Sequence, residues 1–342
     1  MSKINTENWL EAPNNKESFQ KVESLFESVR IKRSSQEPSR LSQNLNSLDS
    51  IQIQDIEGQN KTFREMLTST HTDAFLVLKD GEILFEEYFN GMRPDSFHLM
   101  NSITKSFIGM LVGILSDKGI FHITEKVAKY VPELSEGSFS ETTIQSALDM
   151  SSAVRFEEDY DDPLCDFWKE SAVVGWRPDL VEENSPSSLL DFAMSLQDKE
   201  QEEVESYHYR SVLTNVIGMV IERATNEKLV DLLEKHIWHK LKTEQDAVIV
   251  VDKEGLPFAG AGMNACARDL ARFGQMILND GILKGNRILK SKTVELIKQN
   301  SVNDLFYSGS QGFGYGFAIE YTGKGLNKTS QKGILYWGGY FN

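Results

Sequence analysis

One stretch of this chain constrains its fold more than any other, the run Ser102-Ile-Thr-Lys-Ser-Phe-Ile-Gly-Met-Leu-Val-Gly-Ile-Leu-Ser-Asp-Lys-Gly119. Its charges lie only near the two ends, and Gly119 is a residue that commonly terminates a helix. The pattern predicts a buried helix. Ser102 and Lys105 are three residues apart, so they share one face of that helix and their side chains can meet.

The pair formed by Ser102 and Lys105 is a candidate for nucleophilic catalysis. A lysine buried in an apolar helix is less stable as a cation, so its pKa falls toward neutrality and its amine can act as a base. A neighbouring base is one established way to activate a serine hydroxyl. A serine at a helix N-terminus also offers its own backbone N–H to a developing oxyanion. We therefore predict that Ser102 is a nucleophile and Lys105 its base.

The motif alone is weak, because about one Ser-x-x-Lys match is expected by chance in a chain of this length. A second match is Ser18-Phe-Gln-Lys21. That segment is polar and is predicted to bury nothing, so we interpret it as a chance match. The apolar context separates the two quartets.

The overall charge argues against two classes of partner. The 342 residues carry a formal net charge of −15, which is unfavourable for binding nucleic acid or an anionic membrane. The first residues are polar, no signal peptide is visible, and the longest apolar run is too short to span a bilayer. The two cysteines, Cys165 and Cys266, indicate no disulfide framework. We expect a cytoplasmic protein.

The order of elements predicts an α/β protein in which an antiparallel sheet with flanking helices is interrupted by a mainly helical part. Apolar runs on both sides of Asp80-Gly81 predict a β-hairpin. Helical spacing dominates the middle of the chain, and strand-like runs return near its end. The expected divisions are an N-terminal arm over 1–65, a sheet domain over 66–122 plus 245–342, and a helical domain over 123–244. Within them we expect helices at 143–150, 212–222, 229–241 and 265–279, and strands at 247–251, 314–321 and 333–337.

Two loops attract attention for their composition. Residues 156–163 are rich in acidic side chains but lack the spacing and central glycine of a calcium loop, so we interpret them as a solvated surface. Residues 312–316 are rich in glycine but precede a strand rather than a helix, which favours a tight strand entry over a phosphate site.

A serine–lysine pair also needs a proton relay, and Tyr209 is the candidate, with Ser211 two residues later. An adjacent ammonium favours phenolate, so we expect Lys105 to lower the pKa of Tyr209. Tyr209 would then pass the Ser102 proton to a leaving group.

An oxyanion hole needs a second donor, and the segment Tyr336-Trp-Gly-Gly-Tyr340 is the candidate. A strand edge that ends in glycines lets a substrate approach the backbone closely. The Tyr340 N–H is therefore predicted to pair with that of Ser102 as the oxyanion donors.

Taken in order, these motifs resemble the penicillin-recognising serine hydrolases: class C β-lactamases, D-amino-acid peptidases and related esterases. The similarity is strongest to the branch of 6-aminohexanoate-dimer hydrolases, which have esterase activity. It extends over nearly the whole chain. The segments that carry it are Trp9–Pro13, Thr72–Lys79, Ser102–Lys105, Asp149–Met150, Glu158–Pro163, Gly175–Arg177, Tyr209–Ser211, Ile221–Thr225, Ala267–Gly274 and Trp337–Gly339.

The resemblance implies a β-lactamase/transpeptidase-like fold and a role for each matching residue. Ser102 matches the nucleophile, Lys105 the general base and Tyr209 the proton relay. The Tyr340 N–H matches the second oxyanion donor, and Trp176 matches a residue that lines the substrate pocket. The other residues predicted to contact the substrate are Ser171, Ser211, Trp337, Gly338 and Gly339. No cofactor is implied.

Several positions depart from the family pattern. Ser211 stands where lactamases and peptidases usually carry Asn, and Trp337, Gly338 and Gly339 stand where they carry Lys-Thr-Gly or His-x-Gly. Both departures favour an esterase. Ser171 stands where the amide-cleaving enzyme has an acidic residue that contacts the substrate ammonium, although Glu170 is adjacent. A neutral hydroxyl holds a cation poorly, which makes cleavage of nylon oligomers less expected.

The family continues beyond its Trp-Gly-Gly strand through further strands and a closing helix, whereas this sequence stops at Asn342. We therefore expect C-terminal strands and a helix to be missing, which would leave the strand from Gly333 as an exposed edge. The sequence is then either a fragment or a decayed copy of an enzyme.

The expected function is hydrolysis of a small carboxylic ester or amide, with 6-aminohexanoate-dimer hydrolysis as one form of it. Two alternatives stay open: a β-lactamase or D-amino-acid peptidase, and a degenerate, non-catalytic ligand-binding protein. His236 and His239 share a helix face but lack an obvious third ligand, so no metal site is predicted. The partners expected are the small-molecule substrate and, as an open alternative, a second copy of the chain in a homodimer.

Overall fold

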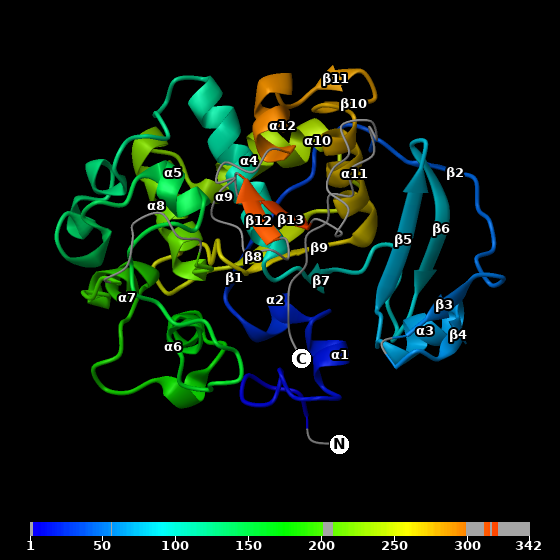
Figure 1. Cartoon of the computed structure of the whole chain (residues 1–342), viewed down its shortest axis with the longest axis horizontal. Helices are drawn as coiled ribbons and strands as arrows, with labels where there is room; N and C mark the ends of the chain where they lie inside the picture. The colour runs from blue at the N-terminus through cyan, green and yellow to red at the C-terminus, as the bar shows by residue number, and fades with distance from the viewer. Residues whose placement is uncertain (1–2, 56, 201–207, 299–310, 315–316, 321–342) are drawn as a thin grey trace.

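The computed structural model describes residues 3–55, 57–200, 208–298, 311–314 and 317–320 (Figure 1). The strands are β1 Ser28–Ile31, β2 Ser42–Gln43, β3 Gln52–Gln54, β4 Asn60–Thr62, β5 Ala74–Lys79, β6 Glu82–Tyr88, β7 His98–Leu99, β8 Ala247–Val250, β9 Met263–Ala265, β10 Ile282–Leu283, β11 Asn286–Arg287, β12 Gln311–Gly314 and β13 Phe317–Glu320. The α-helices are α1 Asn15–Ser18, α2 Val22–Leu25, α3 Phe63–Ser69, α4 Ile103–Asp117, α5 Ile144–Leu148, α6 Asp166–Val173, α7 Leu189–Ser195, α8 Ser211–Thr225, α9 Leu229–Leu233, α10 His239–Leu241, α11 Ala267–Leu278 and α12 Ser291–Lys298. Short 3-10 turns η1 Val127–Lys129, η2 Pro132–Leu134, η3 Gly137–Phe139 and η4 Pro178–Leu180, and a π-helical segment η5 Glu234–Trp238, lie between them.

The central sheet has the strand order β1-β8-β9-β7, and every pair in it is antiparallel. β8 is buried along its whole length, as expected for an interior strand of β-branched residues. β7 is short and leads directly into α4, so the edge of this sheet determines where α4 begins. The predicted α/β fold, with antiparallel sheets and an interposed helical stretch, is confirmed.

Helix α4 lies in the centre of the molecule, as its apolar sequence predicts (Figure 1). All its residues from Thr104 to Leu115 are buried, and Phe107 stacks on Phe273 of α11 with ring centroids 4.1 Å apart. The helix ends at Asp117, and Gly119 follows with a positive φ of 73°. Glycine adopts that conformation without strain, so it serves as the predicted C-terminal stop.

β5 and β6 form the predicted hairpin, which stands apart from the central sheet (Figure 1). Asp80 and Gly81 have φ values of 54° and 84°. Two consecutive positive φ angles are those of a type I′ turn, the connection that Asp-Gly favours. The hairpin pairs with β2 through β6 and has its own small core, in which Phe63 of α3 packs against Phe75 and Phe85.

The region between α4 and β8 contains mainly helices, as expected. α5, α8 and the continuous run α9–η5–α10 occupy the predicted helical segments. α8 packs against α4, and all its residues from Ser211 to Ile221 are buried. The strand expected over 314–321 is shorter, since β12 ends at Gly314 and β13 covers Phe317–Glu320. The strand expected over 333–337 lies outside the described residues.

The N-terminal segment is more than a covering arm. β1 pairs with β8 over four residues and thereby forms one edge of the central sheet. Trp9 is 1% exposed and packs edge-on against Trp176. Ser18 is also fully buried, with its hydroxyl donating to the Trp9 carbonyl at 2.5 Å. The expectation that the Ser18 segment buries nothing is therefore wrong, although Lys21 is exposed and pairs with the exposed Glu17. The division into three domains stays a prediction.

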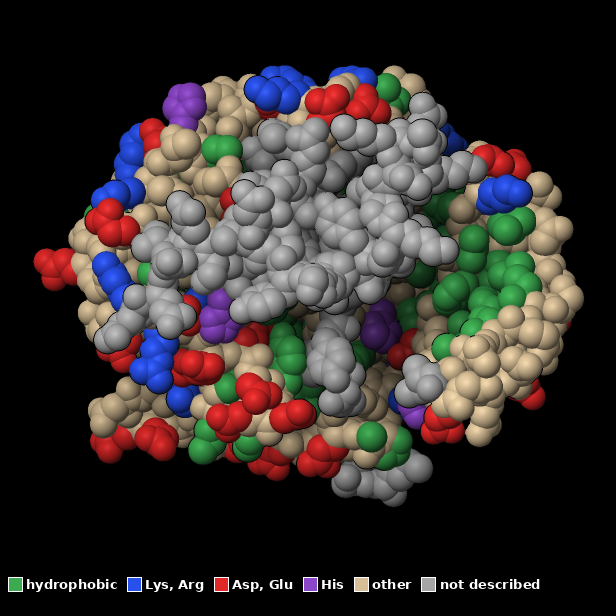
Figure 2. Space-filling model, viewed as in Figure 1, with side chains coloured by type: hydrophobic (Ala, Val, Ile, Leu, Met, Phe, Trp, Pro, Cys, Tyr) green, Lys and Arg blue, Asp and Glu red, His purple; other side chains and the backbone are tan. Residues whose placement is uncertain are grey.

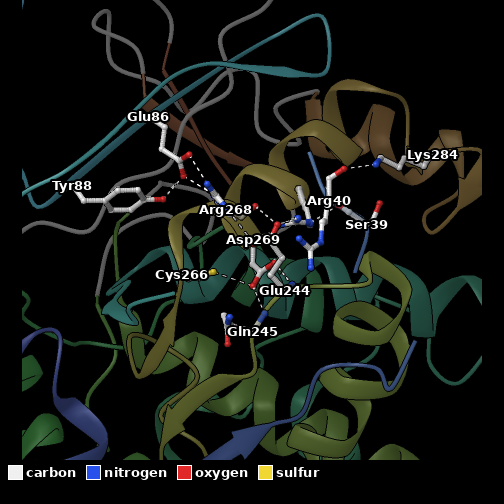
Figure 3. A network of polar contacts seen from close by, with 11 residues as sticks. Ser39, Arg40, Glu86, Tyr88, Glu244, Gln245, Cys266, Arg268, Asp269 and Lys284 are labelled. Atoms are coloured by element: carbon white, nitrogen blue, oxygen red, sulfur yellow. Dashed lines mark hydrogen bonds and ion pairs between the residues drawn. The ribbon is translucent and has the colours of Figure 1, made fainter. Parts of the chain in front are cut away.

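Buried ion pairs and hydrogen bonds attach helix α11 to neighbouring segments of the chain (Figure 3). The fully buried Arg272 guanidinium donates to the Asp269 carboxylate at 3.0 Å and to the Ser39 carbonyl at 2.7 Å, and it pairs with Glu244. Asp269 also accepts from the backbone N–H of Glu244 at 2.8 Å and that of Gln245 at 3.0 Å. These bonds join α11 to the loop before β8 and to the N-terminal segment.

The same helix is joined to the hairpin by a second arginine. Arg268 donates to both carboxylate oxygens of Glu86 on β6, at 2.6 and 2.7 Å, and Tyr88 also donates to Glu86. Burial alone would raise the pKa of Glu86, but the donors from Arg268 and Tyr88 bring it below its usual range. We call the set Glu86, Tyr88, Glu244, Arg268, Asp269 and Arg272 the α11 network.

The surface reflects the excess of acidic residues, 51 Asp and Glu against 36 Lys and Arg. On the face shown in Figure 2, acidic side chains are spread along the lower rim and hydrophobic side chains gather over the hairpin. Of the helices that the structure describes, none is both long enough and apolar enough to cross a membrane.

Candidate active site

A sharp turn between β7 and α4 presents Ser102. Asn101, the residue before it, has a left-handed φ of 46°, a conformation that Asn tolerates better than most residues. The Met263 N–H of β9 donates to the Thr104 hydroxyl at 3.1 Å, and the Met100 N–H donates to the Met263 carbonyl at 2.9 Å. Strand β9 therefore holds the chain on both sides of Ser102, at Met100 and at Thr104.

Ser102, Lys105 and Tyr209 meet as predicted. The Tyr209 hydroxyl donates to Ser102 Oγ at 2.6 Å, and Lys105 Nζ lies 3.2 Å from the same oxygen. Lys105 Nζ also lies 4.9 Å from the centre of the Tyr209 ring. Tyr209 is placed by the start of α8, two residues before its first residue, so the contact joins the beginnings of two buried helices.

The Lys105 amine has two further partners. It donates to Ser211 Oγ at 2.8 Å and to the Gly260 carbonyl at 2.7 Å. Ser211 Oγ in turn donates to Glu158 Oε1 at 2.6 Å, and the Ser211 N–H donates to Glu158 Oε2 at 2.7 Å. Ser211, predicted to contact substrate, therefore connects Lys105 to a carboxylate. We call Ser102, Lys105, Glu158, Tyr209 and Ser211 the Lys105 cluster.

Burial sets the protonation of Lys105. The side chain is 0% exposed, and loss of hydration lowers its pKa from 10.5 to about 8, against the opposing effect of the nearby Glu158 and Glu170 carboxylates. The direction is the one expected for a lysine within an apolar helix. With a pKa near 8, about a tenth of the amine is neutral at pH 7 and can accept a proton.

The expectation for Tyr209 is wrong in direction. The pKa of its phenol is raised, first because the side chain is buried and next because the Glu158 carboxylate disfavours a second negative charge nearby. The hydrogen bonds with Ser102 and Ser211 oppose this shift without reversing it. Tyr209 is therefore a neutral phenol that donates to Ser102, and not a phenolate.

Glu158 corrects a second expectation, that the acidic run 156–163 is a solvated surface. Its carboxylate accepts from Ser211 and from the Tyr160 hydroxyl at 2.6 Å, and burial raises its pKa. A run of acidic side chains is normally exposed, so the composition of 156–163 gave no sign that Glu158 faces inward. One signal was present in the sequence. Glu158 and Tyr160 are two residues apart, so in an extended segment their side chains lie on the same side and can interact.

Two residues predicted to line the substrate pocket are buried in this structure. Ser171 is fully buried, and its hydroxyl donates to the Trp168 carbonyl one turn earlier in α6. Trp176 is also fully buried and packs edge-on against Phe258 and Trp9. A side chain without exposed surface contacts no substrate in this conformation. The remaining predicted residues, Trp337, Gly338, Gly339 and Tyr340, lie outside the described residues.

The described part of the chain brings no three His, Cys, Asp or Glu side chains together as a metal site. His236, considered as a ligand above, has Lys118 Nζ 3.2 Å from its Nδ1 atom. An ammonium at that position competes with a metal ion for the ring nitrogen.

Comparison with known proteins gives this geometry a context. The model of the beta-lactamase family matches residues 60–342. The 6-aminohexanoate-dimer hydrolase of Paenarthrobacter ureafaciens is 32% identical over 293 residues, which are 85% of this chain and 71% of that protein.

Solved structures agree. A Bacillus anthracis protein, provisionally named a 6-aminohexanoate-dimer hydrolase, superposes with a TM-score of 0.83 at 27% identity and covers 93% of this chain and 83% of its own. A penicillin-binding protein homologue from Pyrococcus abyssi shares the fold, with a TM-score of 0.57 at 19% identity over 76% of this chain and 64% of its own. The chain thus belongs to the beta-lactamase family, as a hydrolase related to 6-aminohexanoate-dimer hydrolase.

Proposed function

We propose that this protein is a serine hydrolase that cleaves small carboxylic esters or amides through an acyl-enzyme on Ser102. The observation that carries the proposal is the convergence of two proton-handling groups on one hydroxyl: Tyr209 OH at 2.6 Å and Lys105 Nζ at 3.2 Å from Ser102 Oγ. A nucleophile within hydrogen-bond distance of a base, with that base held by further partners, is the arrangement that nucleophilic catalysis requires.

Acylation begins from the neutral form of Lys105. The amine takes the proton of the Ser102 hydroxyl while Oγ attacks the carbonyl carbon of the substrate, and the carbonyl oxygen becomes an oxyanion. Lys105 then carries the proton as an ammonium, which its three acceptors Ser102 Oγ, Ser211 Oγ and Gly260 O stabilise. The Ser102 backbone N–H, at the start of α4, is one donor to the oxyanion.

Collapse of the tetrahedral intermediate requires a proton on the leaving group. Tyr209 is suited to give it, because its phenol stays protonated and its hydroxyl already points at Ser102 Oγ. The proton stored on Lys105 then restores the phenol. A water molecule then attacks the carbonyl carbon of the ester on Ser102 while the neutral Lys105 amine takes its proton. The Lys105 ammonium returns that proton to Ser102 Oγ as the acid leaves, which regenerates the starting state.

Esters of small acids are the preferred substrate class. Recognition of a 6-aminohexanoate dimer would need a negative charge that reaches the substrate ammonium, and neither residue considered for that task offers one here. Ser171 is neutral and buried, and Glu170 is 0% exposed with its carboxyl facing Asn215. The related hydrolases still make amide cleavage a secondary activity to measure.

The test compares the full chain with its Ser102→Ala variant on p-nitrophenyl butyrate. We expect hydrolysis by the wild type and a loss of at least about 10³-fold in kcat in the variant, as for removal of a serine nucleophile. Equal activity in the two proteins would overturn the proposal.

Two other substrates separate the alternatives. Turnover of a chromogenic cephalosporin faster than the ester would favour a β-lactamase, and turnover of the 6-aminohexanoate dimer would assign the activity of the relatives. No Ser102-dependent turnover of any of the three would favour a non-catalytic ligand-binding protein.

A further inference from the structure

Glu170 is a buried acid that the proposed reaction does not use. It lies on α6 with no exposed surface. Its Oε1 atom accepts from Asn215 Nδ2 at 2.8 Å, while Oε2 has no hydrogen-bond partner among the described residues. Burying a carboxyl group with one partner is costly, so a natural chain retains one mainly where it has a task.

A chain of hydrogen bonds leads from Glu170 to Lys105. Asn215 Oδ1 accepts from the Gly260 N–H at 2.7 Å, and the Gly260 carbonyl accepts from Lys105 Nζ at 2.7 Å. Asn215 lies one turn after Ser211 on α8, so the same helix face supplies both side chains. Glu170 therefore fixes the amide orientation of Asn215, and Asn215 fixes the residue whose carbonyl receives Lys105.

The Gly260 segment has little freedom to move. A Cβ atom added at Gly260 would lie 3.1 Å from the Ser211 carbonyl oxygen and 3.4 Å from Asn215 Oδ1. Contacts this close show that the segment is pressed against α8. A change in the orientation of Asn215 would therefore be transmitted to Gly260 and to the position of the Lys105 amine.

Glu170 performs this task as a neutral acid. Burial raises its pKa to about 8, the hydrogen bond from Asn215 opposes the shift, and the charges that face it are those of Glu158, Lys105 and Asp166. At pH 7 the carboxyl group is mostly protonated, and it accepts from Asn215 through its carbonyl oxygen. Above pH 8 it becomes a carboxylate and adds a negative charge near Lys105.

We propose that Glu170 is a positioning residue of this site, which acts through Asn215 and Gly260 to hold the Lys105 amine against Ser102. The inference rests on the proposed function, because Lys105 must act on Ser102 for its position to matter. Glu170 touches neither the substrate nor the reacting atoms. It differs from a packing residue because its contribution depends on an acceptor atom and on pH.

Two substitutions separate these contributions. Glu170→Met keeps a side chain of similar length but removes the acceptor, so Asn215 loses its fixed orientation. We expect kcat for p-nitrophenyl butyrate to fall about 10- to 100-fold with little change in KM, because a small displacement of a catalytic group impairs the chemical step. Glu170→Gln keeps an acceptor oxygen and should restore most of that loss at pH 7.

The Gln variant also carries a distinctive pH effect. A carboxylate at Glu170 favours the Lys105 ammonium and delays formation of the neutral amine. Gln cannot ionise, so the rising limb of the profile of kcat/KM against pH should move down by about half a pH unit, the size expected for one partly screened charge. The exposed Glu183→Gln is the matched control and should reproduce the wild-type profile.

The outcomes are distinguishable. Absence of Ser102-dependent hydrolysis in the wild type would refute the proposed function itself. An active wild type together with a folded Glu170→Met variant of equal kcat would overturn the role of Glu170. Should the Met variant fail to fold, the Gln variant decides: a profile shifted to lower pH supports the role, and one that superimposes on the wild type rejects it.

Discussion

The α11 network and the Lys105 cluster are two buried sets of charged side chains, and they are built in opposite ways. In the α11 network each carboxylate faces an arginine or several backbone N–H groups, and Arg268 grips both oxygens of Glu86. In the Lys105 cluster the described residues place no carboxylate in direct contact with the cation, since Ser211 lies between it and Glu158. One set pairs its charges and the other keeps them one hydroxyl apart.

The difference separates a structural task from a catalytic one. Arginine stays protonated under all ordinary conditions, so Arg268 and Arg272 form permanent bonds between α11 and its neighbours. Lysine can give up its proton when buried, and burial lowers the pKa of Lys105 to about 8 against the opposing effect of the Glu158 and Glu170 carboxylates. A directly paired lysine would remain charged and could not accept the Ser102 proton.

The largest expected effect is on activity, from Lys105→Met. Removing the base while keeping a side chain of similar length should lower kcat for p-nitrophenyl butyrate by about 10³- to 10⁴-fold. The free energy of unfolding should change by no more than about 2 kcal/mol, because loss of an unpaired buried charge offsets the lost hydrogen bonds. Residual activity within tenfold of the wild type would contradict the role of Lys105.

The same variant tests how the buried Lys105 changes the free energy of unfolding with pH. The pKa of Lys105 is depressed in the folded chain, from 10.5 to about 8, so the unfolded chain binds more protons between these values. The contribution of Lys105 to the free energy of unfolding should therefore rise with pH from 8 toward 10. Denaturation by urea across that range should show a smaller rise in Lys105→Met, and an equal rise in both proteins would contradict the assigned pKa.

The second effect is on stability, from Arg272→Met. This substitution leaves the buried Asp269 carboxylate without its cation, which should cost about 3–5 kcal/mol in the free energy of unfolding. The melting temperature should fall by roughly 10 °C, measured by circular dichroism. Below the new transition, ester hydrolysis should stay within about threefold of the wild type. A large loss of activity in the still-folded variant would contradict the assignment of a structural role to the α11 network.

A third prediction concerns pH and activity. Because neutral Lys105 is the active form and its pKa is about 8, kcat/KM should rise with pH, with a midpoint near 8. Below the midpoint the rate should fall about tenfold for each pH unit, as for a single required deprotonation. Hydrolysis measured in the Ser102→Ala variant supplies the background to subtract. A flat profile between pH 6 and 9 would exclude Lys105 as the base.

The smallest effect is expected on stability, from substitution of Glu86 in the α11 network. Glu86→Gln weakens the grip of Arg268 and should lower the free energy of unfolding at pH 7 by about 1–2 kcal/mol. The pKa of Glu86 lies below 4.5 in the folded chain, so its contribution is present above that value and lost as the pH falls through the folded pKa. The stability difference between variant and wild type should therefore shrink in acid, and a constant difference would contradict the ion pair.

The sequence was sufficient to predict the central features, because they are local. An apolar run with helical spacing led to α4, Asp-Gly led to the hairpin, and Ser102, Lys105 and Tyr209 follow from short motifs. The contact between Ser102 and Lys105 follows from their helical spacing, and the contact of Tyr209 with them follows from the family resemblance. The roles of these residues stay predictions until they are tested.

The features that were missed depend on contacts between distant segments. Glu158 was hidden in an acidic run, and nothing in the sequence relates Glu170 to Asn215, 45 residues later. The polar neighbours of Ser18 predict an exposed segment, although the fold buries Ser18 beside Trp9. The adjacent lysine predicts a lowered pKa for Tyr209, but burial and the Glu158 carboxylate raise it.

The most direct measurement is covalent labelling of the full chain by a fluorophosphonate probe, followed by intact mass and peptide mapping from pH 6 to 10. The account predicts one adduct on Ser102, a labelling rate that rises with a midpoint near pH 8, and no adduct in Ser102→Ala. It also predicts strongly slowed labelling in Lys105→Met. An unlabelled wild type, or an adduct on any other residue, would contradict it.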